Sequence, residues 1–310
     1  MELLKTLCQI HAPSGNESAM KAFILEYVKK NQANWKVQPT IIDGEEFQDG
    51  LILVFGQPKT AVFAHIDTIG FMARYDKELL RIGSPKVQSG YKLRSQTANG
   101  EVFGEVHLKK TSKKKNATKK IFIKSEQNIE RGTDFSFVCD FRESKNYIQS
   151  CYIDNRLGCW VALRLAETLE NGAIVFSCWE EVGGGTAMFQ AKYLHYHYKI
   201  RQALICDISW VTDGVKHGQG VVISLKDSLL PRKKFVEKVV KLAQEAQIPY
   251  QLEVEEYGGS DAKELQLSPY PYDWCFIGAP ESNVHSPDEK VHKADIDAML
   301  RLYEHLLKTL

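Results

Sequence analysis

Carboxylate and histidine side chains recur in this sequence where apolar, strand-like segments end. In residues 173–187, AIVFSCWEEVGGGTA, an apolar run ends at Glu180 and Glu181, and three glycines follow. Ligand sites of open α/β sheets lie where strands end and turns begin. Because two adjacent carboxylates are costly to bury, we expect a positive charge to offset them. This segment therefore indicates a cation site that needs further ligands from elsewhere in the chain.

Four other places combine a strand-like segment or tight turn with a side chain that can bind a metal. They contain His65 with Asp67, Asp154, Asp207 and His285. Taken singly, each has a structural explanation, since an aspartate before Asn-Arg is commonly a helix cap. Taken together, imidazole and carboxylate groups suit zinc, cobalt or manganese better than an all-oxygen calcium cage. Their joint occurrence favours a metal centre.

Strands and helices alternate in the two outer parts of the chain. Apolar runs that predict strands occupy 51–55, 60–66, 173–179 and 203–209. Helical periodicity covers 155–169, about 231–247 and 294–310, and Ser14 to Glu17 fits the capping box that begins a helix. We predict an α/β fold with a mixed central sheet flanked by helices, built from residues 1–72 and 148–310.

The segment between these two parts has a different pattern of apolar and polar residues. From about residue 73 to 147 helical periodicity disappears, and short β-like runs alternate with polar turns. We predict that residues 73–147 form a small all-β domain inserted into the catalytic domain. The basic run KKTSKKKNATKK, residues 109–120, is either a polyanion site or a solvated hairpin loop, and the loop is favoured because charge runs usually face water.

Composition restricts the class of protein. The chain has 310 residues, 44% of them hydrophobic, and a net charge of +1, which gives no electrostatic case for nucleic acid or membrane partners. The N-terminus lacks the features of a signal peptide, and no apolar run approaches the length of a membrane span. The seven cysteines form no Cys-x-x-Cys pair. These features predict a cytoplasmic protein with reduced thiols.

The motifs occur in an order that resembles the tetrahedral, or deblocking, aminopeptidases, a family of di-metal peptidases with glutamyl aminopeptidase-like members. The resemblance covers essentially the full chain. It is carried by AHIDTIGF (64–71), DNRLGC (154–159), EEVGGGTA (180–187), CDISWVTDG (206–214), GGSDA (258–262) and NVHSPDE (283–289). The chain departs from the family pattern in having GGG for Leu-Arg-Gly, DNR for DDR and a shorter length, but these changes leave the ligand set intact.

The resemblance implies a site with two divalent metal ions, zinc first, with cobalt or manganese as alternatives. One ion would be held by His65 and Asp207 and the other by Glu181 and His285, with Asp154 bridging them. Two such ions carry four positive charges. The three ligand carboxylates would balance three of these charges, and a bridging hydroxide would balance the fourth.

The same resemblance assigns catalytic roles to two further carboxylates. Glu180 would be the general base that takes a proton from the metal-bridged water, and Asp67 would orient His65. Residues 65 and 67 lie two apart on a strand and so share one side, in agreement with this role. Asp213 and Asp261 match family positions near the site and are weaker candidates.

The activity implied by the resemblance is removal of N-terminal residues from short peptides by a homo-oligomer that associates through the inserted domain. Related di-metal enzymes use the same ligand order, so an N-acyl amino acid deacylase or a carboxypeptidase is an alternative. Glycan hydrolysis is less favoured, because a glycosidase needs two carboxyl groups that are free of metal. A non-catalytic scaffold would have lost a ligand or Glu180, and neither is lost.

Overall fold

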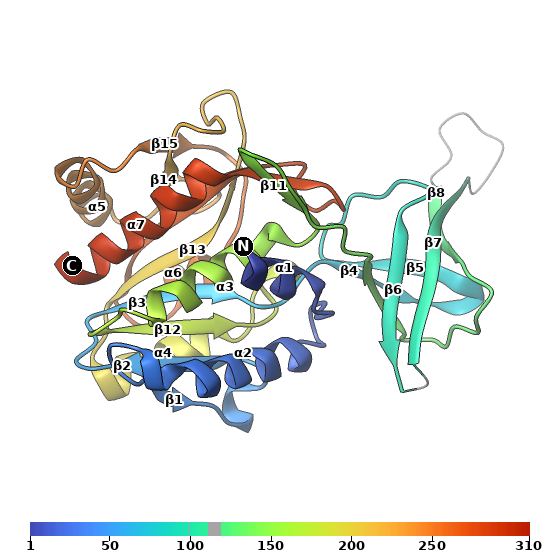
Figure 1. Cartoon of the computed structure of the whole chain (residues 1–310), viewed down its shortest axis with the longest axis horizontal. Coiled ribbons are helices and arrows are strands. Elements are labelled where there is room, and N and C mark those ends of the chain that lie inside the picture. Colours follow the sequence, from blue (N-terminus) through green and yellow to red (C-terminus); the bar gives the residue numbers. More distant parts are fainter. Residues whose placement is uncertain (99, 111–118) are drawn as a thin grey trace.

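The computed structural model describes residues 1–98, 100–110 and 119–310. Its described part contains one large mixed sheet and one small closed barrel, which lies to the side of the large sheet (Figure 1). Both were expected, so the prediction of an α/β fold with a mixed central sheet and a small all-β unit is confirmed.

The centre of the large sheet consists of parallel strands. The order along the sheet is β1-β2-β12-β3-β13-β16-β17-β11-β10, with β14 paired to β16 and β15 paired to β14. Strands β12, β3, β13 and β16 are mutually parallel, so their carboxyl ends lie at the same edge. The strands are β1 Thr40–Ile42, β2 Leu51–Phe55, β3 Thr60–His65, β10 Arg142–Glu143, β11 Tyr147–Ser150, β12 Gly172–Ser177, β13 Gln202–Trp210, β14 Val221–Lys226, β15 Tyr250–Val254, β16 Asp273–Ser282 and β17 Glu289–His292.

Helices cover both faces of this sheet. The helices are α1 Glu2–Gln9, α2 Ser18–Asn31, α3 Ile153–Ala166, α4 Ala187–Tyr198, α5 Lys233–Glu245, α6 Ala262–Leu267 and α7 Lys293–Thr309. Apolar residues of α1, α2, α3, α5 and α7 share one core cluster, and those of α4 and α6 share the other. Alternate residues of β3 enter the two clusters, Val62 the first and Phe63 the second, as expected for a strand that is buried on both faces.

The barrel closes in the order β4-β5-β8-β7-β6-β9. Its strands are β4 Gly70–Ala73, β5 Glu78–Ile82, β6 Lys92–Thr97, β7 Gly100–Lys110, β8 Lys119–Lys124 and β9 Asp134–Phe137. Phe71, Phe135 and Phe137 are among its buried core residues. The strands that follow it, β10 and β11, belong to the large sheet. Residues 111–118 of the basic run lie outside the described residues, so the solvated loop stays a prediction.

The capping box predicted at Ser14 to Glu17 is wrong. Helix α2 begins at Ser18, and Glu17 precedes it without a side-chain cap. The Ser14 hydroxyl instead donates to Asp67 Oδ2 at 2.6 Å, and Glu17 accepts the Gly15 N–H at 2.8 Å. The sequence has the residues of a capping box, but the Ser14 side chain bonds Asp67 instead of the backbone at the start of the helix.

None of the described helices combines the length and hydropathy needed to cross a membrane.

Candidate metal centre

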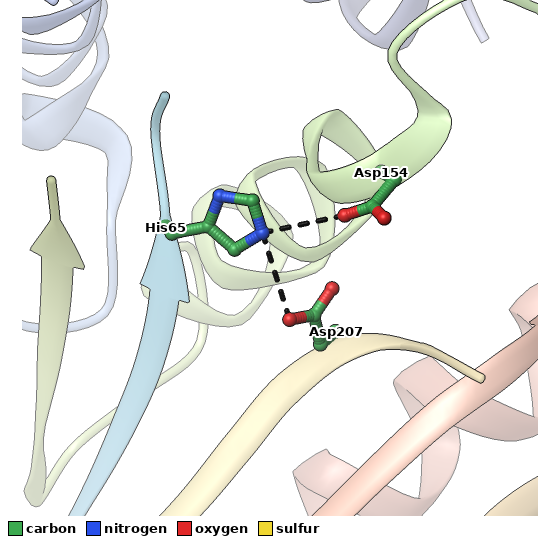
Figure 2. A group of neighbouring side chains, drawn as sticks. All are labelled: His65, Asp154 and Asp207. Atoms are coloured by element: carbon green, nitrogen blue, oxygen red, sulfur yellow. Dashed lines mark ion pairs between the residues drawn. The ribbon is translucent and has the colours of Figure 1, made fainter. Parts of the chain in front are cut away.

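The predicted ligands meet at the edge where the parallel strands end. His65 is the last residue of β3, and Asp207 lies in the neighbouring strand β13. Asp154 lies in the first turn of α3. Figure 2 shows the side chains of these three residues pointing toward one another from two strands and a helix. Glu180 and Glu181 form a short 3₁₀ turn after β12, and His285 lies between β16 and β17.

Three of these residues form the first cluster. His65 Nε2 lies 3.3 Å from Asp154 Oδ1 and 3.6 Å from Asp207 Oδ2. One ligand atom from each of the three residues lies within 4.8 Å of the others. All three side chains are buried. This spacing lets one ion contact all three residues.

The second cluster shares Asp154 with the first. His285 Nε2 lies 3.3 Å from Asp154 Oδ2 and 3.3 Å from Glu181 Oε2. Asp154 therefore faces one histidine with each of its carboxylate oxygens. Each of the two histidine–carboxylate clusters, which share Asp154, could hold a metal ion.

Buried atoms without partners test whether a metal fits here. His65 is only 1% exposed, yet its Nε2 makes no hydrogen bond with any residue that the structure describes, although oxygens of Asp154 and Asp207 lie 3.3 and 3.6 Å away. Glu181 Oε1 also makes no hydrogen bond within the described part of the chain. Buried polar atoms rarely lack a partner, and histidine nitrogens and carboxylate oxygens are the usual ligands of divalent zinc. The donor set therefore fits divalent metal ions.

The site carboxyl groups differ in their electrostatic environments. Burial raises the pKa of Glu180 well above its usual value; His65 opposes this rise, and Asp207 adds to it. Burial also acts to raise the pKa of Asp154, but His285 and His65 overcome that effect and hold it well below its usual range. The pKa of His285, which burial alone would lower, is raised to about 11 by Asp154 and Glu181.

Asp67 links the histidine to the turn that carries the adjacent glutamates. Its Oδ1 lies 3.3 Å from His65 Nδ1. It also accepts the N–H groups of Glu180 at 3.1 Å and of Glu181 at 3.2 Å. Burial opposes ionisation of Asp67, but contacts with His65 and Ser14 lower its pKa overall. One buried carboxylate thus positions both the imidazole and the Glu180–Glu181 backbone.

Close packing places the start of α3, and with it Asp154. Asn155 Nδ2 donates to the Cys206 carbonyl at 2.9 Å, and its Oδ1 accepts the Gly158 N–H at 2.8 Å. A Cβ at Gly158 would lie 2.1 Å from the Cys206 oxygen, so only glycine allows this approach of α3 to β13. The peptide bond between Asp154 and Asn155 is cis.

Some residues around the site were not predicted from the sequence. Ser84, which follows β5 of the barrel, places its Oγ 2.8 Å from His285 Nδ1. A single serine in a polar loop gives no signal of such a role. Glu289, at the start of β17, accepts the N–H groups of His285 at 2.9 Å and Asp154 at 3.2 Å. Of the two weaker candidates, Asp261 is buried and accepts the Ser177 hydroxyl, whereas Asp213 is exposed.

Comparison with known proteins agrees with this architecture. The family model for the M42 glutamyl aminopeptidases matches residues 52–302, a range that contains every candidate ligand. A protein of Acetivibrio thermocellus named as an aminopeptidase is 29% identical, over 97% of this chain and 96% of the relative.

Solved structures share the fold at lower identity. An aminopeptidase from the archaeon Desulfurococcus kamchatkensis aligns with a TM-score of 0.86 and 24% identity, over 100% of this chain and 94% of the other. The TET1 peptidase of Pyrococcus horikoshii, which can assemble into a tetrahedron or a large octahedral shell, aligns with a TM-score of 0.80 and 23% identity, over 100% and 99% of the two chains.

The α/β fold with its histidine–carboxylate clusters, together with the family match, identifies a peptidase of a metal-dependent class. The chain belongs to the M42 glutamyl aminopeptidase family. The expectation of a peptide-hydrolysing enzyme is thereby confirmed.

Proposed function

We propose that this chain is an aminopeptidase that uses two divalent metal ions to remove N-terminal residues from short peptides. The observation that carries the proposal is the shared carboxylate of Asp154, which faces His65 with one oxygen and His285 with the other. His65 and Asp207 would hold one ion, and Glu181 and His285 the other. Zinc suits these ligands, with cobalt or manganese as alternatives. When bound, the ions would polarise the scissile carbonyl and acidify the attacking water.

Glu180 is the residue of the chain that we assign to proton transfer. It adjoins the first cluster, with Oε2 3.8 Å from His65 Nε2, but it is a member of neither cluster. Burial raises its pKa, so its carboxylate holds a proton more readily than an exposed glutamate does. It can take the proton of the attacking water and return it to the leaving amine. Asp67 keeps the Glu180 backbone and the His65 ring in place for this transfer.

A substrate panel tests the proposed activity against its alternatives. The protein is stripped with a chelator, reloaded with zinc, cobalt or manganese, and assayed on free-amine, N-acylated and C-terminally extended peptides. We expect hydrolysis of free-amine peptides from the N-terminus and its loss on chelation. Activity confined to N-acylated substrates would indicate a deacylase, and release of C-terminal residues would indicate a carboxypeptidase. Either result would refute the aminopeptidase.

The barrel, whose strands run from Gly70 to Phe137 and so overlap most of the predicted insert 73–147, is the part of the chain that we assign to self-association. Met72 on β4 and Leu80 on β5 face each other across the antiparallel pair and are 42% and 50% exposed. Phe103 on β7 adds a third exposed apolar side chain. Neighbouring apolar groups on a surface commonly mark an interface. The Pyrococcus horikoshii relative forms large assemblies, which agrees with this assignment.

Charged substitutions on the barrel test the self-association. Replacing Met72 and Leu80 together by lysine is expected to shift the protein to a smaller species in sedimentation velocity, because buried ammonium groups destabilise an apolar interface. Leu267→Lys is the matched control, since Leu267 is 67% exposed on α6, outside the barrel. An unchanged sedimentation coefficient for the Met72/Leu80 variant would argue against this surface.

We place the enzyme in the cytoplasm, because all seven cysteines are free thiols.

A further inference from the structure

The cavity at the metal centre has an acidic wall that the proposed mechanism does not use. This cavity has a volume of about 660 Å³, and its lining includes Glu180 and His285. Its lining also includes Asp227, Glu253 and Glu255, which we call the acidic wall. Because the wall and the catalytic residues share one cavity, a peptide with its scissile bond at the metal centre places neighbouring groups close to the wall.

The fold places the acidic wall beside the ligand Asp207. Asp227 directly follows β14, and Glu255 directly follows β15, the strand paired with it. Ser209 of β13 donates a hydrogen bond to Glu253 of β15. Since Ser209 lies two residues beyond Asp207 on the same strand, both side chains point to the same side. The acidic wall therefore continues from the first cluster along the surface of the cavity.

Two of the three carboxylates of the wall, those of Asp227 and Glu253, are buried and form no ion pair within the described part of the chain. Asp227 and Glu253 are only 5% and 7% exposed. Asp227 Oδ1 accepts the N–H of Leu229 at 2.6 Å, while no described residue bonds its Oδ2. None of the three carboxylates forms an ion pair within the described part of the chain. The nearby Lys226 Nζ donates instead to the carbonyls of Asp227 at 2.7 Å and Glu255 at 3.0 Å.

A cation on the ligand would offset the cost of this burial. Burial raises the pKa of both Asp227 and Glu253, although the Leu229 N–H and the charge of Lys226 oppose the rise at Asp227 and the Ser209 hydroxyl opposes it at Glu253. Lys263 is the one lysine or arginine among the described residues that line the cavity, against three carboxylates of the wall. The charge of this part of the cavity therefore favours a positive group and disfavours an acidic one.

The remaining lining suits a long side chain with a cationic end. Leu229, Tyr257 and Phe276 contribute apolar surface to the same cavity. Lysine and arginine combine an apolar stem with a terminal charge, so they can contact both kinds of surface. We propose that the acidic wall selects peptides whose N-terminal residue is lysine or arginine. This inference rests on the proposed aminopeptidase function and names the substrate class of that site.

Substrate preference and direct binding test the proposal together. The metal-loaded enzyme is assayed with lysyl, arginyl, leucyl and glutamyl amides of one fluorogenic amine. We expect kcat/KM for the lysyl and arginyl substrates to exceed that for the leucyl substrate by about ten-fold or more, as one charge-assisted contact provides. Free lysine is expected to bind more tightly than norleucine, its counterpart without the cation, in calorimetry on the same protein.

Variants of the wall separate the side-chain contact from other effects. Glu255→Gln and Asp227→Asn should each lower the lysyl-to-leucyl ratio of kcat/KM, by roughly ten-fold if one contact of this kind is lost. Glu256→Gln, an exposed neighbour outside the cavity lining, should leave that ratio unchanged. An equal loss for every substrate would assign the wall to the α-amino group common to all peptides, and would overturn the proposal.

The outcomes distinguish this inference from the function on which it rests. Hydrolysis of the leucyl amide without preference for lysyl and arginyl amides would refute the inference and leave the aminopeptidase intact. Absence of hydrolysis on every free-amine substrate would refute the proposed function. In that case the comparison of lysine with norleucine binding still decides whether the wall selects a cationic side chain, and equal affinities would overturn it.

Discussion

Glu180→Gln is expected to lower kcat by about 10²–10⁴-fold, the range that general acid–base catalysis commonly provides, while the protein retains its metal. The substitution keeps the size of the side chain and removes its capacity to take a proton. The backbone contact of Glu180 with Asp67 does not involve the substituted group, so the turn should persist. Metal stoichiometry by elemental analysis and kcat over a metal titration are the measurements.

Glu181→Gln is the matched comparison, because it makes the same chemical change one residue away. Glu181 Oε2 lies 3.3 Å from His285 Nε2, within the second cluster, so its loss should weaken metal binding first. Activity of this variant should recover in part at high metal concentration. If Glu180→Gln loses metal and Glu181→Gln keeps it, the two roles are reversed. Near-normal kcat for Glu180→Gln at full metal occupancy would remove it from proton transfer.

Asp154→Asn should weaken the binding of both metal ions. Asp154 is the residue common to the two clusters, and the change removes the one negative charge that they share. Replacing a residue that only supports a metal ligand costs about 10–100-fold in affinity, so loss of a shared ligand charge should exceed about 100-fold. Titration calorimetry of the metal-free protein with zinc gives the stoichiometry and affinity. Hydrolysis of a free-amine peptide should fall with metal occupancy.

Two controls show whether this effect is specific. Asp213→Asn removes an aspartate that is exposed and outside both clusters, so it should bind metal like the unmodified protein. His285→Ala removes a ligand of the second cluster alone, and should weaken one binding event more than the other. If Asp154→Asn retains two sites of normal affinity, the bridging role is wrong. If it loses one site only, Asp154 serves a single ion.

The barrel contributes to the centre as well as to the proposed self-association. Ser84 contacts the His285 ring, and the N–H of Lys86 donates to the His285 carbonyl at 2.8 Å. Both residues lie in the loop between β5 and β6, so a loop of the barrel contacts a ligand of the second cluster. A disturbance of the barrel therefore reaches the metal centre through a short chain of contacts, in addition to any change in assembly.

The sequence alone was sufficient for the fold class and the family, and it indicated which side chains were candidate metal ligands. Buried parallel strands are continuous apolar segments, and their carboxyl ends are where polar side chains gather in α/β sheets, so His65 and the Glu180–Glu181 pair stood out locally. The family followed from the order of motifs along the chain, which is itself a linear property. The apolar segments, the polar residues at their ends and the order of motifs are properties of the linear sequence, so they can be recognised without the folded structure.

Tertiary structure decided which atoms face each other and what surrounds them. That Asp154 faces two histidines with its two oxygens depends on how α3 packs against β13, and Gly158 permits that packing by having no side chain. Ser14 does not form the expected capping box, because its hydroxyl bonds Asp67, a residue far along the chain. The acidic wall likewise depends on tertiary structure, because folding brings residues in or just after β14 and β15 into the same cavity as Asp207. Local pattern cannot anticipate such contacts, because their free energy arises between segments that only folding brings together.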